Sequence, residues 1–343
     1  MAFIQISKER SIKDYGEPYF VAELNTSHFG NIQTAKNMID QAKIAGCDCV
    51  KFQSWSESSL YTKDYYKENP IAKRFFKKFS LSAKELLELV AYCQNVGISF
   101  ASTPYSKSEV DFLVENCDVP FIKIASMDLN NLPLLEFIGS ASKPIVLSTG
   151  MGTIDEVKRA VEVLNNAGTY DICILHCVAV YPPKIEMLQL NNILGLRKSF
   201  SNYPIGYSDH SIGIEMACAA VALGASLIEK HFTLDKTKLG MDNQMATEPD
   251  EMKNLIKSCK NIYSALGSQD RKLSKIEYDQ RVKMRRSIVS SRVIKMGDFI
   301  TRKDLDLKRP GTGISPVEIE SLIGRRVAKD IEIDEIIKMD DLV

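Results

Sequence analysis

Two of the chain's four histidines could together bind a metal ion. His210 in YSDHSIG and His231 in EKHF each stand at the end of a β-rich apolar segment, and one segment follows the other along the chain. If these segments are neighbouring strands, both imidazoles can reach one ion. Two imidazoles are fewer than the three protein ligands usual for catalytic zinc, so water and substrate oxygens would complete the shell. The pattern predicts a divalent metal, with Mn²⁺ expected first and Mg²⁺ next, although imidazole also accepts zinc.

Polar side chains also stand at or near the ends of the other β-rich runs. They are Glu23, Lys51, Gln53, Thr103, Lys123, Ser148, His176, Ser208 and Glu229. A single strand-end lysine or threonine is usually only a solvated end, but polar ends on every run predict one shared site. The lysines and hydroxyl groups suit an anionic substrate such as a phosphate or carboxylate. The amides of LSTGMGT (147–153), where a helix should begin, would add an oxyanion site.

The elements that must position these residues alternate between short apolar runs and longer helical patterns up to residue 265. The runs cover residues 19–24, 47–53, 98–103, 120–126, 144–149, 171–177, 204–208 and 226–232. Eight such units in roughly 250 residues are typical of a (β/α)8 barrel, whose active site forms at the carboxyl ends of the strands. A doubly wound sheet would need a Gly-rich phosphate turn after its first strand, and ELNTSHFGN is not one.

The alternation changes after residue 265. The polar, basic segment ALGSQDRKLSKIEYDQRVKMRR (265–286) is typical of a connector, and the apolar runs beyond it are shorter. We therefore predict a barrel domain at 1–266, a linker at 267–286 and a small β-rich domain at 287–343. A domain of about 57 residues is too small to be very stable alone, so we expect it to dock on another surface.

Composition and charge narrow the function classes. Lys+Arg and Asp+Glu both number 44, so no net charge favours nucleic acid. The eight cysteines form no CxxC pair and most lie in apolar segments, which indicates reduced thiols rather than disulfides. No stretch approaches ~18 apolar residues, and the N-terminus lacks the apolar core of a signal peptide. We expect a soluble, cytoplasmic protein that binds neither membranes nor nucleic acid.

A series of motifs along nearly the whole chain resembles the sialic acid synthase family, the phosphoenolpyruvate-condensing enzymes that include legionaminic and pseudaminic acid synthases. The motifs are VAEL…SHFGN (21–31), VKFQ (50–53), STPYS (102–106), FIKIAS (121–126), LSTGM (147–151), LHC…YP (175–182), GYSDHS (206–211), ALGASLIEKHFTLD (222–235) and KRPGTGIS (308–315). The resemblance implies a (β/α)8 barrel followed by a small antifreeze-like (SAF) domain. It also implies a domain-swapped homodimer in which Arg309 reaches into the partner's barrel.

The same resemblance implies a role for each matching residue. His210 and His231 would bind the metal. The phosphate and carboxylate of phosphoenolpyruvate would lie among Lys51, Thr103, Lys123, Ser126, Ser148 and Ser208. Glu23 and Gln53 would flank the reacting carbons, and the acceptor sugar would lie toward Tyr181, Asp242 and Arg309. The expected catalytic residues are Glu23, His231 and Arg309.

Two segments depart from the family pattern near the expected acceptor site. Val178 and Ala179 follow Cys177 where the family usually has polar residues, and GMDNQ (240–244) stands in place of a Gly-Pro-Asp-His-like run. A more apolar pocket would suit a 6-deoxy or doubly acylated sugar. We therefore expect a metal-dependent condensation of phosphoenolpyruvate with open-chain N-acetylmannosamine or a 6-deoxy diacetamido relative. The products would be a nine-carbon sugar acid and phosphate, with Glu23 or a water on the metal transferring the proton.

Two other functions stay open from the residues alone. A Schiff-base aldolase or lyase could act through Lys123, because burial lowers the pKa of a lysine and makes its amine a nucleophile. That class needs no metal, so chelators would not inhibit it. A non-catalytic sugar-binding protein that recognises its ligand through the C-terminal domain would leave the polar rim of the barrel without a purpose.

Overall fold

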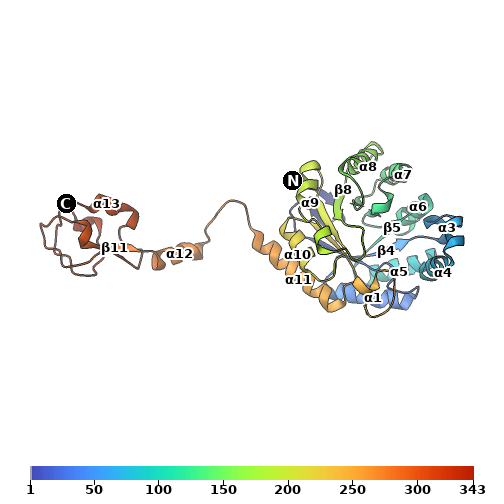
Figure 1. The fold of residues 1–343 in the computed structure, drawn as a ribbon, viewed down its shortest axis with the longest axis horizontal. Helices are drawn as coiled ribbons and strands as arrows, with labels where there is room; N and C mark the ends of the chain where they lie inside the picture. The colour runs from blue at the N-terminus through green and yellow to red at the C-terminus, as the bar shows by residue number, and fades with distance from the viewer. Residues whose placement is uncertain (1) are drawn as a thin grey trace. The chain divides into compact units, whose positions relative to one another are not determined.

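The computed structural model describes residues 2–343 and divides the chain into two compact units. The first unit ends at Gly267, and the second runs from Ser268 to Val343. In Figure 1 the first unit is coloured from blue to light orange and consists of strands surrounded by helices, while the second is coloured from orange to red.

Eight parallel strands of the first unit close into a barrel in the order β10-β3-β4-β5-β6-β7-β8-β9. The strands are β3 (Tyr19–Glu23), β4 (Cys49–Ser54), β5 (Ser99–Pro104), β6 (Ile122–Ile124), β7 (Ile145–Ser148), β8 (Ile172–Cys177), β9 (Ile205–Asp209) and β10 (Leu227–His231). Each predicted run overlaps one of these strands to within one residue at its end, which confirms the (β/α)8 barrel. β6 is short because the chain soon turns into the 3₁₀ helix η1 (Ser126–Asp128).

Helices follow the strands and surround the barrel (Figure 1). They are α1 (Ile32–Ala45), α5 (Ala83–Val96), α6 (Lys107–Asn116), α7 (Leu132–Ser140), α8 (Ile154–Asn166), α9 (Asn192–Ser199), α10 (Glu215–Ala222) and α11 (Pro249–Leu266). α1 and α5 end on Gly46 and Gly97, which adopt left-handed φ angles of 98° and 72°. Among the helices of residues 2–343, none has the length and apolar character needed to cross a membrane.

Three short helices are inserted between β4 and α5. They are α2 (Glu57–Leu60), α3 (Lys63–Glu68) and α4 (Pro70–Phe79). Tyr66, Phe76 and Phe79 from these helices form a small buried cluster with Trp55, which follows β4, and this cluster is separate from the main core. The simple alternation of strands and helices did not predict this insertion.

The inside of the barrel is filled with apolar side chains toward its amino end. Side chains alternate along each strand, and the inward residues of the first layers pack against a hairpin of β1 (Phe3–Gln5) and β2 (Ser11–Lys13). This cluster consists of Ile4, Ile6, Ile12, Tyr19, Val21, Cys49, Ala101, Phe121, Val146, Cys173, Leu175 and Leu227. Outward residues such as Phe20 and Val50 belong to the larger core shared with the helices. The barrel is thus a packed core toward its amino end, and active sites of barrels of this kind form at the carboxyl end.

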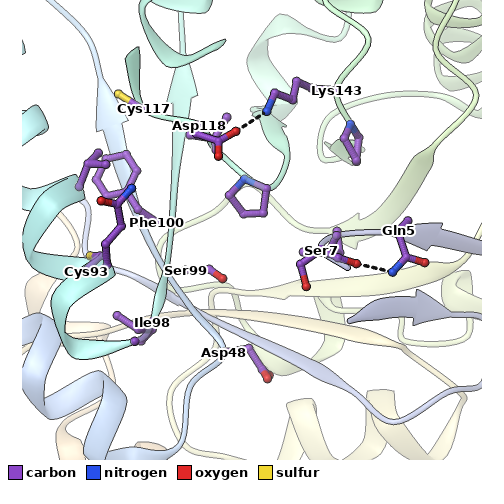
Figure 2. Close-up of a pocket in the computed structure, with 17 residues that line it drawn as sticks. Gln5, Ser7, Asp48, Cys93, Ile98, Ser99, Phe100, Cys117, Asp118 and Lys143 are labelled. Carbon is purple, nitrogen blue, oxygen red and sulfur yellow. Dashed lines mark hydrogen bonds and ion pairs between the residues drawn. The ribbon is translucent and has the colours of Figure 1, made fainter. Parts of the chain in front are cut away.

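A pocket of about 690 Å³ lies at the amino end, among the hairpin and the residues that precede β4 to β7 (Figure 2). Its charged groups are paired within the fold. Lys143 Nζ lies 2.9 Å from Asp118 Oδ1, and Asp48 accepts a hydrogen bond from the Phe20 amide at 2.8 Å. These pairs tie together the ends of neighbouring strands, so their role is structural.

The second unit begins with α12 (Lys275–Met284), a helix within the predicted linker. Its core is a cluster of Ile288, Ile294, Ile300, Ile314, Leu322, Val327, Ile331 and Ile337. The paired strands are β11 (Ser287–Ser290) and β12 (Leu305–Lys308), and α13 (Ile319–Leu322) adds one helical turn. Isolated bridges, such as Ile294 with Ile331, complete the backbone pairing. This unit therefore has mixed structure rather than a regular sheet.

Candidate active site

A pocket of about 230 Å³ opens at the carboxyl end of the barrel strands. It brings together every barrel residue that was expected to bind the metal or a substrate or to act in catalysis, whereas His176, one of the predicted polar strand ends, lies outside it. The residues that it brings together are Glu23, Lys51, Gln53, Thr103, Lys123, Ser126, Ser148, Tyr181, Ser208, His210, His231 and Asp242. Its lining also includes Glu229, one of the polar strand ends identified in the sequence, and Ala179, which was expected near the acceptor. The sequence suggested no site role for the other lining residues, which are Tyr105, Ala125, Met127, Met151 and Cys177. Arg309 belongs to the other unit, where it follows β12 and is exposed.

The alternation of the strands places these side chains in one layer. In β10 the inward residues run from Leu227 through Glu229 to His231, so the apolar core changes to polar groups along a single strand. The register pairs His231 with Glu23 and Glu23 with Lys51, so residues far apart in sequence lie side by side. The polar layer is therefore a direct result of strand register.

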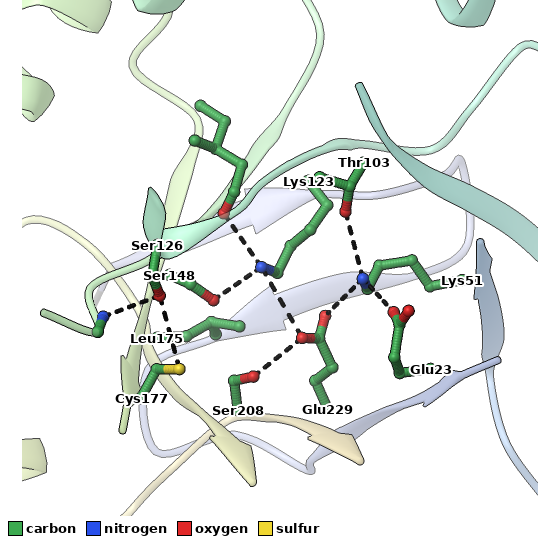
Figure 3. A network of polar contacts seen from close by, with 12 residues as sticks. Glu23, Lys51, Thr103, Lys123, Ser126, Ser148, Leu175, Cys177, Ser208 and Glu229 are labelled. Atoms are coloured by element: carbon green, nitrogen blue, oxygen red, sulfur yellow. Dashed lines mark hydrogen bonds and ion pairs between the residues drawn. The ribbon is translucent and has the colours of Figure 1, made fainter. Parts of the chain in front are cut away.

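A buried network of charges forms the floor of the pocket (Figure 3). Lys51 contacts Glu23 directly, and its Nζ lies 3.8 Å from Glu229 Oε2. Lys123 Nζ lies 3.8 Å from Glu229 Oε1, so Glu229 is shared between the two lysines. All four side chains are at most 7% exposed. Charges buried to this degree interact strongly, because little water screens them.

Three hydroxyl groups complete the network. Lys51 donates to Thr103 Oγ1 at 3.2 Å, and Lys123 donates to Ser148 Oγ at 2.7 Å. Ser208 donates to Glu229 Oε1 at 2.9 Å. Two ammoniums and three hydroxyls thus converge on one volume, which is the donor set that a phosphate or carboxylate requires.

Opposing effects set the protonation of the two buried carboxyl groups. Burial raises the pKa of Glu23, and the nearby Lys51 only partly offsets this. Burial would also raise the pKa of Glu229, but Lys123 and Lys51 together bring it below its usual value. Glu229 therefore stays ionised, whereas Glu23 is the carboxyl group able to carry a proton. The sequence placed Glu229 among the polar strand ends, two residues before His231 on the same face of the strand, but it did not indicate the role of this carboxylate.

The two lysines also differ in their protonation. Burial lowers the pKa of Lys123, although Glu229 partly compensates. Burial acts in the same direction on Lys51, but its two carboxylate neighbours, Glu229 and Glu23, outweigh it and raise the pKa. Lys51 is thus firmly cationic, and Lys123 is the more easily deprotonated of the pair.

The two histidines predicted to bind metal face one another. Their ring centroids are 5.3 Å apart. His210 Nδ1 donates to Val178 O at 2.8 Å, so in the neutral ring Nε2 is the nitrogen that could bind a metal. Burial lowers the pKa of His231, so this imidazole is neutral and can act as a ligand. Its Nδ1 lies 3.9 Å from Asp242 Oδ2.

This donor set fits a divalent ion that also takes oxygen ligands. A backbone carbonyl bound to the second nitrogen of a histidine fixes its tautomer and orientation, as Val178 O does for His210. Within residues 2–343, no group of three or more His, Cys, Asp or Glu side chains forms a metal cage. The remaining ligands would therefore be water or substrate oxygens, as for Mn²⁺ or Mg²⁺.

The other two histidines have structural roles. His28 Nδ1 accepts a hydrogen bond from the Gly30 amide at 3.0 Å, which fixes the loop after β3. His176 points out of the barrel, where Nε2 bonds Leu188 O at 2.7 Å and the ring stacks on Tyr207. Neither lines the active-site pocket.

The expected oxyanion site at the start of α8 is not formed as predicted. Thr153 and Glu156 form a capping box, so these side chains bond the first amides of the helix. The Gly150 amide instead donates to Ser126 Oγ at 2.9 Å. A Cβ atom on Gly150 would lie 2.8 Å from Ser126 Oγ, so glycine permits this close approach. Ser126 thus supports the turn as well as lining the pocket.

The outer wall of the pocket is apolar. Met127 and Met151 line it and are 55% and 69% exposed, and Ala179 lies beside them. Tyr181 packs against the His210 ring with centroids 4.3 Å apart. The inner part of the pocket is therefore polar, and its lining also offers apolar surface from Met127, Met151 and Ala179.

Comparisons with known proteins show what this chain is similar to. A family model described as the NeuB family matches residues 38–271, and a SAF domain model matches residues 285–343. An uncharacterized protein of Methanocaldococcus jannaschii is 41% identical over 96% of both chains. The N,N'-diacetyllegionaminic acid synthase of Legionella pneumophila is 35% identical over 91% of both chains.

A solved structure is also similar. The N-acetylneuraminic acid (sialic acid) synthetase of Leptospira borgpetersenii is 31% identical, with a TM-score of 0.75 over 81% of this chain and 96% of that one. With its barrel, its C-terminal domain and these relatives in agreement, the chain belongs to the NeuB family and carries a SAF domain.

Proposed function

We propose that the chain condenses phosphoenolpyruvate with an open-chain N-acetylated amino sugar to give a nine-carbon sugar acid and phosphate. The observation that carries this proposal is the buried network of two lysines and three hydroxyls beside two facing imidazoles. Membership of the NeuB family supports it. We propose Mn²⁺ as the metal, with Mg²⁺ or another divalent ion as the alternative.

The two lysines are the proposed anchors for phosphoenolpyruvate. Its phosphate and carboxylate would contact Lys51 and Lys123 at the floor of the pocket, where burial strengthens charge attraction. The hydroxyls of Thr103, Ser148 and Ser208 already bond this network and would orient the anion. This arrangement would hold carbon 3 of phosphoenolpyruvate toward the mouth of the pocket.

The two carboxyl groups would act at different steps. The new bond forms between carbon 3 of phosphoenolpyruvate and the aldehyde carbon, which leaves positive charge at carbon 2. Glu229, held ionised by the lysines, would stabilise that charge. Water then adds to carbon 2, and phosphate leaves by cleavage of the carbon–oxygen bond. Glu23, whose pKa is raised, would accept a proton from that water, and the former aldehyde oxygen, left as an alkoxide, would take up a proton to become the new hydroxyl.

The histidines would hold the metal close to the aldehyde. A divalent ion bound by His210 and His231 would act as a Lewis acid toward the aldehyde oxygen. Val178 O and the ring of Tyr181 hold His210 in place. Asp242, beside His231, would accept a hydrogen bond from an acceptor hydroxyl.

The outer wall favours an acceptor without a phosphate. Among the described residues that line the pocket, the only lysines are Lys51 and Lys123, both in the deep network, and arginine is absent. The barrel itself would therefore offer a sugar phosphate no further cation, apart from the Arg309 that we propose the partner subunit to supply. A 6-methyl group and a second acetamido group would instead contact Met127, Met151 and Ala179. We propose a 6-deoxy diacetamido hexose, and the name of the Legionella relative supports this choice.

We also propose that the active form is a domain-swapped homodimer in which Arg309 serves the partner's pocket. Arg309 is exposed within its own unit, which supports a role at a surface contact. Mixing Arg309→Ala and His231→Ala subunits tests this directly. Half of the randomly mixed dimers would carry one intact site, so roughly a quarter of wild-type activity should return. Mixtures as inactive as their parents would contradict the swap.

The reaction itself is tested by measuring phosphate release from phosphoenolpyruvate with a panel of acceptors. We expect release with an unphosphorylated 6-deoxy diacetamido hexose and Mn²⁺, with a product mass equal to the sum of both substrates plus water minus phosphate. N-acetylmannosamine 6-phosphate should be a poor acceptor. The absence of phosphate release with every N-acetyl hexosamine would refute the proposed reaction.

A Schiff-base aldolase or lyase that acts through Lys123 is the second candidate function, because burial lowers the pKa of this lysine. Its ammonium is nevertheless bonded to Ser148 Oγ and Ile124 O and lies near Glu229, which suits anion binding better than attack on a carbonyl. Borohydride trapping distinguishes the two. A covalent adduct on Lys123, together with indifference to chelators, would favour the aldolase or lyase.

A further inference from the structure

A second buried ion pair lies directly behind the two histidines, on the outer side of the barrel wall. Asp209 immediately precedes His210, and Lys230 immediately precedes His231. The strand register pairs Asp209 with Lys230, and Lys230 Nζ donates to Asp209 Oδ2 at 2.7 Å. Because side chains alternate, this pair faces outward while both imidazoles face the pocket.

Further hydrogen bonds join the pair to residues around His210. We call this bonded group of Tyr207, Asp209, Ser211 and Lys230 the clasp. Asp209 Oδ1 accepts from Ser211 N at 2.9 Å and from Ser211 Oγ at 2.7 Å. The Tyr207 hydroxyl donates to the same oxygen at 3.2 Å. Lys230 Nζ also donates to Ser211 O at 2.6 Å. The residues on both sides of His210 are thereby tied to the residue next to His231.

Burial of the two charges in the clasp destabilises the fold unless the charges stay paired. Asp209 is 1% exposed and Lys230 is 2% exposed. A buried ion pair adds little net stability compared with apolar residues of similar size, whereas loss of one partner leaves an uncompensated charge. The main effect of this ion pair is therefore to hold the groups that it joins in one arrangement.

We propose that Asp209 and Lys230 are positioning residues that set the spacing of the His210 and His231 imidazoles for a divalent ion. The inference rests on the proposed metal site. The ion pair holds the backbones of β9 and β10 together at the step from which both histidines project. A change in this pair would alter the separation of the two rings without touching either of them.

The chain offers a matched control at the amino end of the barrel. Arg197 Nε lies 3.1 Å from Asp14 Oδ1, and their side chains are 11% and 12% exposed. Arg197 also donates to Gly224 O, in the turn before β10. This pair is likewise buried and links separate segments, but it lies at the opposite end of the strand from His231.

The experiment measures Mn²⁺ binding alone, by titration calorimetry of the full chain without substrates. Asp209→Asn keeps the size of the side chain and can keep its bonds to Ser211, but it turns an amide nitrogen toward Lys230. Lys230→Met removes the ammonium. We expect each variant to bind Mn²⁺ about 10-fold or more weakly, the range found when groups that orient metal ligands are lost. Asp14→Asn, the same substitution in the control pair, should bind Mn²⁺ as wild type does.

Thermal melting of the metal-free proteins separates positioning from general damage. If Lys230→Met does not fold, Asp209→Asn carries the test. Wild-type Mn²⁺ affinity in Asp209→Asn would overturn the inference, as would an equal loss of affinity in Asp14→Asn. If wild type itself binds no Mn²⁺, or if His210→Ala/His231→Ala binds it as tightly as wild type, the proposed metal site fails and the inference fails with it.

Discussion

The two ends of the same barrel differ in what their inward side chains do. At the amino end, residues such as Tyr19 and Leu227 form an apolar layer closed by a hairpin. At the carboxyl end, one or two alternations further along the same strands, the inward residues are charged or hydroxylic, as Glu229 and His231 are. One fold therefore separates stability from chemistry along the length of each strand.

Charge pairs at the two ends show the same division. Lys123 and Glu229 are buried in the pocket floor with other charges and hydroxyls around them. Lys143 and Asp118 form an isolated pair at the amino end, where Asp118 is 89% exposed. Water screens the second pair and not the first, so equal substitutions should have unequal effects.

The largest expected effect is on catalysis at the carboxyl end. Lys123→Met removes a proposed phosphate or carboxylate donor, and we expect kcat/KM to fall by about 10²–10³-fold, as when one donor to a charged transition state is lost. Steady-state phosphate release under Mn²⁺ measures this. A fall of less than about 10-fold would indicate that Lys123 does not contact the anion.

The next effect is on stability at the amino end. Leu227→Ala opens a cavity in the apolar layer and should lower the free energy of unfolding by about 2–5 kcal/mol. Urea unfolding measures the loss. Protein that remains folded should keep the wild-type KM for phosphoenolpyruvate, and a raised KM would show that the two ends are not separate.

A pH effect should distinguish the carboxyl end from the amino end. Burial raises the pKa of Glu23 above its ordinary value of 4.5. Folding favours the neutral form of Glu23. The contribution of this residue to the free energy of unfolding is therefore fully present below pH 4.5 and is lost as pH rises through the raised pKa. Compared with Glu23→Gln, wild type should lose about 1.4 kcal/mol per pH unit in that window.

Unfolding free energies of both proteins across the pH series provide the measurement. If the two curves run parallel from pH 4 upward, the pKa of Glu23 is not raised in the folded protein. Asp118→Asn at the amino end is the control for the loss of a carboxyl group, because this side chain is 89% exposed and its ion pair contributes only about 0–1 kcal/mol.

The smallest expected effect is that of the substitution at the amino end that corresponds to Lys123→Met. Lys143→Met breaks a partly exposed ion pair that contributes about 0–1 kcal/mol. We expect unchanged kcat/KM and a shift in unfolding free energy within that range. A large loss of activity would assign a function to the amino-end pocket.

The barrel and most of its site could be predicted because both follow from local patterns. Apolar runs give the strands, and alternation gives the face on which Lys51 and Gln53 lie. The division of roles between Glu23 and Glu229 could not be predicted, because it depends on which carboxylate lies between two lysines. Those contacts join β3, β4, β6 and β10, and only the closed register brings them together.

Other features were not predicted from the sequence, because they too depend on side-chain contacts rather than on local patterns. The three-helix insertion is held by aromatic contacts between Trp55 and Phe76, which no short period reveals. The start of α8 has the expected glycine-rich turn, but Thr153 and Glu156 use its amides for a capping box. Asn25 and Asp242 are hydrogen-bonded to one another although most of the barrel sequence separates them. Local sequence predicts elements, and side-chain competition decides what they do.

The central claim is that the polar end of the barrel condenses phosphoenolpyruvate by cleaving its carbon–oxygen bond. Phosphoenolpyruvate labelled with ¹⁸O in the oxygen that bridges carbon 2 and phosphorus tests it most directly. The account predicts that phosphate released in the presence of the acceptor sugar and Mn²⁺ keeps the label, as mass spectrometry of the phosphate would show. Unlabelled phosphate, with the label left in the sugar acid, would contradict it.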